Sequence, residues 1–584
     1  MSDKAADGKW QMGDGKSPDS RLPTPDSGRL THNEEIKGAI PTVAGTIAQT
    51  LADPKADHFS QDDYEFLKFH GCYQQDDRDL RKTGKKFIMM VRSRIPGGVM
   101  TANQWRVFDD LSAQYGNNTL RVTTRQTIQF HGILKANLRA VIRAINESLL
   151  STLAACGDVC RNVLATPTPA YTKAREQVLA DCHRVVAAVA PRTPAYHGIW
   201  IDGVQLNLDE PANKEFVDPL YGKSYLPRKF KFAFAIPPSN DIDVFTNDVG
   251  FIAIVEDDRL VGYNLAVGGG MGRTHGNDAT YPRLADVIGF FKPEKLEAIA
   301  KAAVTVHRDF GDRTNRRHAR FKYIVQERGA DWTRAEIEKR AGIKLEPAKP
   351  FQFATSGDLY GWRQAVDGKW FLTIFVETGR VKDMEGHRLK TALRQVADKY
   401  SELEFRLSAN QNLILARVIE EDRDAITELL TEHGVRTGLR QTTILHAAAM
   451  ACPALPTCGL ALAESERMLP GLVDRIEKVC DEVGLAGEEI IIRSTGCPNG
   501  CARPYTAELA FVGKAPGRYQ IWLGGDLAGT RLARVWKELV RDADIESELR
   551  PVLTRYANER FNRESFGDWC DRALLNEPVT GFSI

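Results

Sequence analysis

The sequence predicts an α+β fold in which a strand–helix–strand half-domain occurs twice, related by a pseudo-two-fold axis. An α/β domain is inserted between the two copies, and another α/β domain follows at the C-terminus. Three observations lead to this prediction. The chain has 584 residues, too many for one hydrophobic core. One segment resembles a second, distant segment without a gap, and four cysteines are crowded together in the last quarter of the chain.

The internal repeat relates residues 85–135 to residues 370–420 at a constant offset. In each copy a short apolar run typical of a strand comes first, and a pattern of helical spacing follows. A second strand is then expected over residues 120–133 and, in the other copy, over residues 405–418. Because the copies are far apart in the chain, we expect two half-domains that fold against each other.

The second strand of the first copy alternates apolar and polar residues, so its polar residues are expected to line one face. These residues are Arg121, Thr123, Arg125, Thr127, Gln129 and His131. Two cations beside an amide and an imidazole suit an anionic ligand. In the second copy Ile414 and Ala416 replace the Gln and the His, so only the first copy is expected to bind that ligand. A solvated face with ion pairs is the simpler alternative for the arginines alone.

Residues 227–234 alternate in the same way, with Lys229 and Lys231 on one side and phenylalanines on the other. Both ammonium groups should therefore point in one direction. An edge strand with a charged exterior would produce the same pattern.

The cysteines form two close pairs, Cys452 with Cys458 (C-x5-C) and Cys497 with Cys501 (C-x3-C). Four thiolates could hold a structural zinc ion, but zinc sites prefer tighter pairs. Proline and glycine keep both loops irregular, which leaves backbone N–H groups free to bond sulfur, as an iron–sulfur cluster requires. We therefore favour a cluster over zinc. The remaining cysteines are expected to be buried, inert thiols: Cys72, Cys156, Cys160, Cys182, Cys480 and Cys570.

Composition argues against several other classes of protein. The 78 basic and 77 acidic residues nearly cancel, which does not suit a nucleic-acid or membrane surface as the main partner. No apolar run approaches the roughly 20 residues that cross a bilayer, and the first 50 residues resemble neither a secretory signal nor a transit peptide, so we expect a cytoplasmic protein. The Gly-, Asp-, Ser- and Pro-rich start predicts a flexible tail that can be removed up to about Thr46.

The cysteine pattern, with Cys497 and Cys501 in the segment T-G-C-P-N-G-C, resembles the signature of the sirohaem-containing sulfite and nitrite reductases. The likeness continues through residues 69–79, 94–98, 124–132, 161–164, 225–231 and 267–270. The resemblance implies a [4Fe–4S] cluster on Cys452, Cys458, Cys497 and Cys501, with Cys501 bridging to the sirohaem iron. It also implies that four side chains surround the substrate: Arg92, Arg161, Lys229 and Lys231. The residues implied to hold the sirohaem are Arg121, Arg125, Gln129, His131, Arg228, Arg320 and Asn499.

Within this family the likeness is greatest to the NADPH-dependent assimilatory sulfite reductases, which implies a six-electron reduction of sulfite to sulfide for cysteine biosynthesis. The chain has no dinucleotide-binding fingerprint, so the implied NADPH electrons would arrive through a separate FAD and FMN flavoprotein, with ferredoxin as the alternative donor. Nitrite reductase is the nearest rival, although it typically has Asn where this chain has Lys231. A zinc-stabilised, non-catalytic binding protein is the rival from another class.

With this resemblance the expected segments are a flexible tail (1–58), the first ferredoxin-like half (59–153), a domain that binds sirohaem and substrate (154–360), the second ferredoxin-like half (361–435), and a C-terminal domain for the cluster and sirohaem (436–584).

Overall fold

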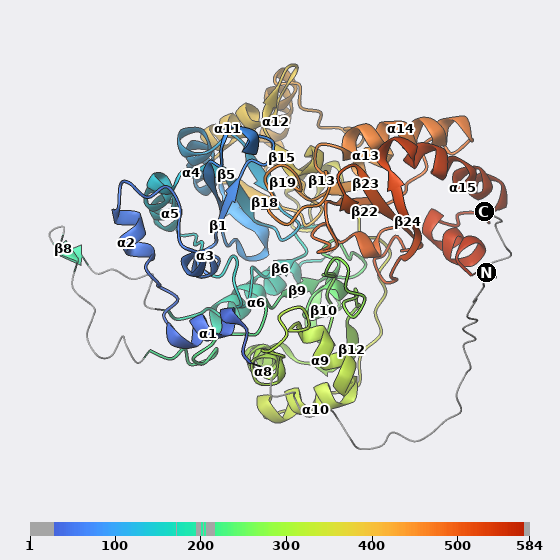
Figure 1. The fold of residues 1–584 in the computed structure, drawn as a ribbon. Coiled ribbons are helices and arrows are strands. Elements are labelled where there is room, and N and C mark those ends of the chain that lie inside the picture. Colours follow the sequence, from blue (N-terminus) through green and yellow to red (C-terminus); the bar gives the residue numbers. More distant parts are fainter. Residues whose placement is uncertain (1–28, 171, 194–199, 202–203, 206–215, 577–584) are drawn as a thin grey trace, which may run out of the picture.

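The computed structural model describes residues 29–170, 172–193, 200–201, 204–205 and 216–576. Figure 1 shows the two half-domains together at the top, the inserted domain below them in green, and the C-terminal domain in red at the right. Among the described residues, none of the helices is both long and apolar enough to cross a membrane.

The two half-domains form sheets of matching topology, as the repeat predicts. The first sheet has the order β1 (Cys72–Asp76), β2 (Phe87–Arg92), β5 (Ile128–Ile133), β4 (Leu120–Val122), β15 (Arg380–Val381). The second has the order β13 (Gly361–Gln364), β14 (Trp370–Ile374), β19 (Leu413–Val418), β18 (Glu404–Leu407), β3 (Val99–Thr101). Each sheet thus takes its last strand from the other copy, a reciprocal exchange that fits the predicted pseudo-two-fold.

One shared core joins the half-domains. The helices of the half-domains are α4 (Ala102–Tyr115) and α5 (Leu138–Glu147) in one copy and α11 (Leu389–Lys399) and α12 (Glu420–Glu432) in the other. Buried apolar residues of both copies belong to a single cluster. At its centre the indole of Trp105 stacks on the ring of Phe405, with 4.9 Å between the ring centroids.

The expected second strand of each copy is a hairpin and not one continuous strand, so this prediction is wrong. Gln126 and Gln411 adopt left-handed backbone conformations (φ 49° and 73°) and reverse the chain between β4 and β5 and between β18 and β19. A hydrogen bond from the Thr123 amide to the Thr127 carbonyl closes the first turn. Arg125 therefore lies in a turn, and the polar residues do not share one strand face.

The inserted and C-terminal domains also have matching sheets. The inserted sheet has the order β12 (Asp286–Phe291), β11 (Arg259–Val267), β10 (Val249–Glu256), β9 (Phe232–Ala235), β6 (Leu164–Ala165). The C-terminal sheet has the order β24 (Arg534–Arg541), β23 (Arg518–Leu523), β22 (Leu509–Ala515), β21 (Ile492–Thr495), β20 (Ala449–Ala451). In both sheets the last three strands of the order run parallel to one another. The first two strands of the order each pair antiparallel with their neighbours. The duplication thus extends beyond the repeat found in the sequence.

Helices cover these two sheets. Those of the inserted domain are α6 (Arg175–Ala188), α8 (Leu296–Phe310), α9 (Phe321–Arg328) and α10 (Ala330–Ala341). Those of the C-terminal domain are α13 (Ile444–Ala447), α14 (Leu469–Glu482), α15 (Ile545–Glu559) and α16 (Phe566–Trp569). A turn with a left-handed first residue precedes β10 and β22, at Asp243 (φ 47°) and Arg503 (φ 53°). The carboxylate of Asp243 pairs with the guanidinium of Arg503, so the two domains meet at equivalent turns.

The predicted flexible tail differs from the structure from residue 29 onward. Helices α1 (His32–Ala39) and α2 (Ile47–Ala52) form within it, and α3 (Gln61–Leu67) follows directly after it. The ammonium group of Lys37 is buried, donating to Glu34 (2.5 Å), to Asp158 (3.4 Å) and to the Leu226 carbonyl (2.8 Å). Buried ion pairs anchor α1 to the inserted domain, and an apolar periodicity cannot reveal them. Residues 1–28 lie outside the described part of the chain.

This anchor gives a testable expectation for stability. Replacing Lys37 by Ala should reduce the free energy of unfolding by about 3 kcal/mol, because two buried carboxylates lose a partner. Glu35→Ala is the matched control, since Glu35 forms only an exposed pair with Arg29, and its effect should stay below about 0.5 kcal/mol. Denaturant unfolding of both variants measures the difference, and equal losses would contradict the anchor.

Candidate active site

Three segments bring the four predicted substrate residues together. Arg92 ends β2, while Arg161 precedes β6 and the two lysines precede β9. The Arg161 amide donates to the Phe230 carbonyl at 2.9 Å, which places the arginine beside the lysine segment. Phe230 and Phe232 are fully buried in the core of the inserted domain. Lys229 and Lys231 are therefore held on the opposite side, as the alternation predicts.

The lysines are crowded by other cations. Burial, followed by the charges of Arg228, Arg320 and Arg161, lowers the pKa of Lys229 to about 7. Burial and the neighbouring Arg125 hold the pKa of Lys231 well below its usual range. Lys229 can therefore release a proton near neutral pH, as a general acid must, and the ammonium group of Lys231 is more acidic than that of an ordinary lysine.

The arginines of this group are fixed by backbone and sulfur acceptors. Arg161 donates to the carbonyls of Gly157 (2.7 Å) and Ala155 (3.2 Å). Arg92 donates to the sulfur of Cys156 at 3.2 Å. With the Gln129 amide turned so that its oxygen faces Arg92, the Nε of Arg92 donates to it at 3.0 Å. Cys156 was expected to be inert, and its contact with Arg92 was missed because a lone cysteine carries no sequence signal.

Several residues predicted to hold sirohaem surround the same region. Arg125 donates to the Asn162 carbonyl (3.3 Å) and to the Asn247 side chain (2.9 Å). Burial and Arg503 lower the pKa of Arg125 to about 9. Arg320 pairs with Asp248 at 3.0 Å. A guanidinium whose pKa falls this far lacks a counter-charge, so the site suits an anionic ligand.

Buried polar atoms without hydrogen-bond partners give a second test of whether the site suits an anionic ligand. His131 Nδ1, Arg320 Nε and Asn162 Oδ1 are buried and have no hydrogen-bond partner among the described residues. Arg228 is 4.0 Å from Asp158, and burial with Arg316 lowers its pKa to about 10. Buried polar atoms without partners are rare and indicate a missing ligand or water. These residues therefore fit a group that carries several carboxylates.

Arg121 is arranged differently from this expectation. Its buried guanidinium pairs with Glu466 and donates to the Ala451 carbonyl at 2.8 Å. Glu466 also accepts from Arg380 at 2.8 and 3.0 Å. In the structure Arg121 thus links the first half-domain to the C-terminal domain. The sequence reasoning missed Glu466, since one carboxylate far along the chain has no recognisable pattern.

The four predicted cluster ligands lie near one another at the end of the C-terminal sheet. Cys452 and Cys497 are buried, Cys458 is half-buried and Cys501 is exposed. The Gly496 amide donates to the Cys452 sulfur (3.3 Å), and the Asn499 side chain donates to the Cys497 sulfur (3.4 Å). Donors of this kind suit an iron–sulfur cluster.

The charges of the thiols interact. Burial, followed by Cys501, raises the pKa of Cys497 to about 12, and burial with Cys501 and Cys497 raises the pKa of Cys452 well above its usual range. Bound iron supplies the positive charge that would reverse these shifts. Within the described residues, no three His, Cys, Asp or Glu side chains lie close enough to hold a single metal ion.

Cys501 connects the thiols to the cationic group. Its carbonyl accepts from the Thr124 hydroxyl at 2.9 Å, beside Arg125 in the turn of the first half-domain. Its thiol affects the pKa of both Arg92 and Lys229. Cys501 is therefore close to the cationic group that the four predicted substrate residues form.

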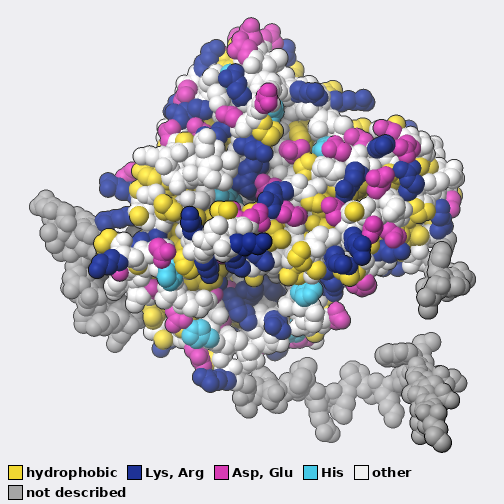
Figure 2. Space-filling view, turned by 45° about the horizontal axis from the view of Figure 1, so that its top comes forward, with side chains coloured by type: hydrophobic (Ala, Val, Ile, Leu, Met, Phe, Trp, Pro, Cys, Tyr) yellow, Lys and Arg dark blue, Asp and Glu magenta, His cyan; other side chains and the backbone are white. Residues whose placement is uncertain are grey.

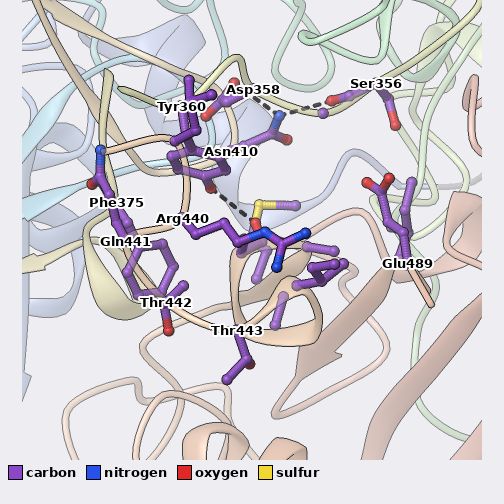
Figure 3. A pocket seen from close by; sticks show the side chains of 18 of the residues that line it. Ser356, Asp358, Tyr360, Phe375, Asn410, Arg440, Gln441, Thr442, Thr443 and Glu489 are labelled. Carbon is purple, nitrogen blue, oxygen red and sulfur yellow. Dashed lines mark hydrogen bonds between the residues drawn. The ribbon is translucent and has the colours of Figure 1, made fainter. Parts of the chain in front are cut away.

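A separate cavity of about 350 Å³ lies between the second half-domain and the C-terminal domain (Figure 3). It occupies the pseudo-symmetric position of the cationic pocket. Asn410 stands where the first copy has Arg125. Counting back from the equivalent strands β21 and β9, Glu489 and Ile491 stand where Lys229 and Lys231 stand. These three positions carry no cation, although Arg440 and Arg493 also line the cavity.

The molecular surface agrees with the balanced composition. Figure 2 shows acidic and basic side chains mixed over most of one face, with Lys and Arg gathered near its middle.

Comparison with known proteins identifies the family. A model described as the nitrite/sulfite reductase ferredoxin-like half domain matches residues 80–148 and 363–433. A model described as the nitrite and sulphite reductase 4Fe-4S domain matches residues 180–345. That span contains Cys182 but none of the four predicted ligands, so it does not itself locate the cluster.

Curated relatives cover almost the whole chain. The sulfite reductase [NADPH] hemoprotein beta-components of Geobacillus kaustophilus and Bacillus subtilis are each 48% identical to it. Their alignments cover 94% and 96% of this chain and 96% and 98% of those proteins. The structure of Mycobacterium tuberculosis NirA is similar in fold, with a TM-score of 0.74 and 22% identity over 93% of this chain and 96% of that one. The chain therefore belongs to the nitrite and sulfite reductase family.

Proposed function

We propose that this chain is the haemoprotein subunit of an NADPH-dependent assimilatory sulfite reductase and reduces sulfite to sulfide with six electrons. The observation that carries the proposal is the group of Arg92, Arg161, Lys229 and Lys231, which are buried or half-buried beside Cys501. It combines an anion site, two proton donors and a potential metal ligand. The names of the curated relatives point to the same activity.

The proposed cofactors are a [4Fe–4S] cluster and sirohaem. Cys452, Cys458, Cys497 and Cys501 would hold the cluster. The sirohaem carboxylates would be held by Arg125, Arg228, Arg320, Gln129, His131 and Asn499. Arg121 would join them only by giving up Glu466. When bound, these cofactors supply the electrons for the reduction.

The chain's own residues supply charge and protons. Arg92 and Arg161 supply guanidinium groups, which bind and polarise the sulfite oxygens. Lys229 and Lys231 donate the protons with which the three oxygens leave as water, because their lowered pKa values permit proton transfer. Burial keeps bulk water from screening these charges.

The donor and the location are further parts of the proposal. The relatives' names include NADPH, and this chain lacks a dinucleotide fingerprint, which supports a separate FAD and FMN flavoprotein as the donor. Ferredoxin is the second candidate. A cytoplasmic location stays a prediction.

Sulfite chemistry should depend on Lys231 more than nitrite chemistry does. Asn at this position keeps hydrogen bonding but supplies neither the charge nor the acid, so kcat/KM for sulfite should fall by at least ~10²-fold. Nitrite reduction should suffer less, and the visible spectrum should not change. Paired kinetics with a chemical one-electron donor measures both. Equal losses on the two substrates would leave Lys231 as a general anion anchor.

The pH profile should report Lys229. Sulfite turnover is expected to fall as the pH rises above about 7, because Lys229 then loses the proton that it donates. Bound anions raise its pKa, so the inflection should lie at or above this value. Lys229→Arg keeps the charge but cannot donate a proton, so it should lower turnover and remove the inflection. An inflection that persists in this variant would assign it to another group.

Cys501→Ser should abolish sulfite turnover while the fold is retained. This ligand is proposed to serve both cofactors, so its loss should weaken the cluster and break the electronic contact between the two. Iron and acid-labile sulfide content and the visible spectrum provide readouts besides activity. Cys480→Ser is the control, because Cys480 lies in α14 and was assigned no ligand role. Normal turnover in the Cys501 variant would rule out the bridge.

A further inference from the structure

We infer that a cluster-side surface, made of residues 77–86 and the exposed side chain of Leu460, is the docking site for an acidic protein that carries FMN and donates electrons one at a time. This inference rests on the proposed function, since it concerns how the electrons for sulfite arrive.

The cluster-side surface lies directly over a predicted cluster ligand. The Arg78 amide donates to the Pro456 carbonyl at 3.2 Å, and its guanidinium donates to the Ala461 carbonyl at 2.6 Å. These two carbonyls flank Cys458 in sequence, and the charge of Arg78 acts on its thiol. Electron transfer between proteins weakens steeply with distance. A donor bound here would be separated from the predicted cluster only by the turn of chain that carries Cys458.

Two leucines are exposed on the cluster-side surface. Leu80 is 53% exposed and Leu460 is 70% exposed, on the two loops that Arg78 joins. A solvated basic loop would explain charged residues here, but it gives no reason for large apolar side chains beside them. An apolar centre with a polar rim is typical of a protein–protein contact. The small interfaces of transient electron-transfer complexes need no larger patch.

The rim of the cluster-side surface is positively charged. Arg81, Lys82, Lys85 and Lys86 are all exposed. Arg81 is paired with Asp76, and Lys85 lies over the ring of Phe87 at 4.6 Å. No ion pair is found for Lys82 or Lys86 among the described residues. Asp77 and Asp79 are the only acidic residues of the segment, which leaves a local excess of positive charge in a chain whose net charge is +1.

The positive charge of the cluster-side surface determines which kind of partner protein it binds. Unpaired exposed lysines attract an acidic surface and raise the rate of encounter, and salt weakens the effect because the charges are solvated. The opposite end of the cluster serves another purpose, since Cys501 faces the buried cations of the substrate pocket. Electrons would therefore enter at the Cys458 side and leave at the Cys501 side.

The test compares two electron donors. The triple variant K82E/K85E/K86E should raise the KM for an NADPH-reduced FAD and FMN flavoprotein by at least about tenfold at low salt. Its turnover with a chemical one-electron donor should equal that of the unaltered enzyme. The difference between variant and wild type should shrink as salt is added. The variant L80S/L460S should weaken the protein donor with little salt dependence, since it removes apolar contact.

A matched control carries the same charge change elsewhere. Lys292, Lys295 and Lys301 are exposed on and before α8, in the lower part of Figure 1, whereas the four predicted cluster ligands belong to the C-terminal domain at the right. K292E/K295E/K301E should behave as wild type with both donors.

The outcomes separate this inference from the proposed function. Wild-type kinetics of both cluster-side variants with the flavoprotein would overturn the docking site, as would a similar loss in the control variant. A loss with the chemical donor as well would place these residues in the reaction and not in docking. If the unaltered, cofactor-loaded enzyme does not reduce sulfite with the chemical donor, the proposed function fails. Calorimetric binding of the flavoprotein to the same variants then still decides the docking site.

Discussion

The concentration of buried positive charge is the constraint on which the rest of the structure depends. Arg125, Arg161, Arg320 and the two lysines lie within one region, and burial disfavours the charges of Arg125 and the lysines. The protein offsets part of the cost with carboxylates supplied by other segments. Asp248 pairs with Arg320, and Asp158 lies between Lys37 and Arg316. The buried polar atoms that still lack a hydrogen-bond partner mark where an anionic ligand would balance the remaining positive charge.

These compensating pairs also connect the domains. Asp243 of the inserted domain meets Arg493 and Arg503 of the C-terminal domain, and Glu466 of the C-terminal domain meets Arg121 of the first half-domain. Removing one partner of such a pair leaves an uncompensated charge, which is far more costly than losing a surface ion pair. Domain arrangement and site chemistry therefore depend on the same side chains. The duplicated architecture makes this possible, because the two copies meet along the pseudo-two-fold and present different residues to their two cavities.

Much of this could be predicted from the sequence, and the successes have a common physical cause. The repeat, the cysteine pairs and the alternation around Lys229 are local patterns, and local backbone geometry translates them directly into structure. Failures arise where contacts join distant segments. The anchoring of α1 through Lys37, the role of Glu466 and the contact of Cys156 with Arg92 each involve one residue whose partner lies far away in the chain. The hairpin at Gln126 was missed because one left-handed residue breaks an alternation that otherwise continues on both sides.

Lysine serves two purposes in this molecule, and the surroundings decide which. Lys229 and Lys231 are half-buried among other cations, so their pKa values fall and the ammonium groups become stronger acids. Lys82 and Lys86 are exposed, where water and salt surround the charge, so they act only through a screened field. A partner protein can reach Lys82 and Lys86 but not Lys229 and Lys231. A small anion is bound only at Lys229 and Lys231, where burial strengthens the electrostatic attraction. The same side chain thus provides proton transfer inside the protein and protein recognition at its surface, without one function disturbing the other.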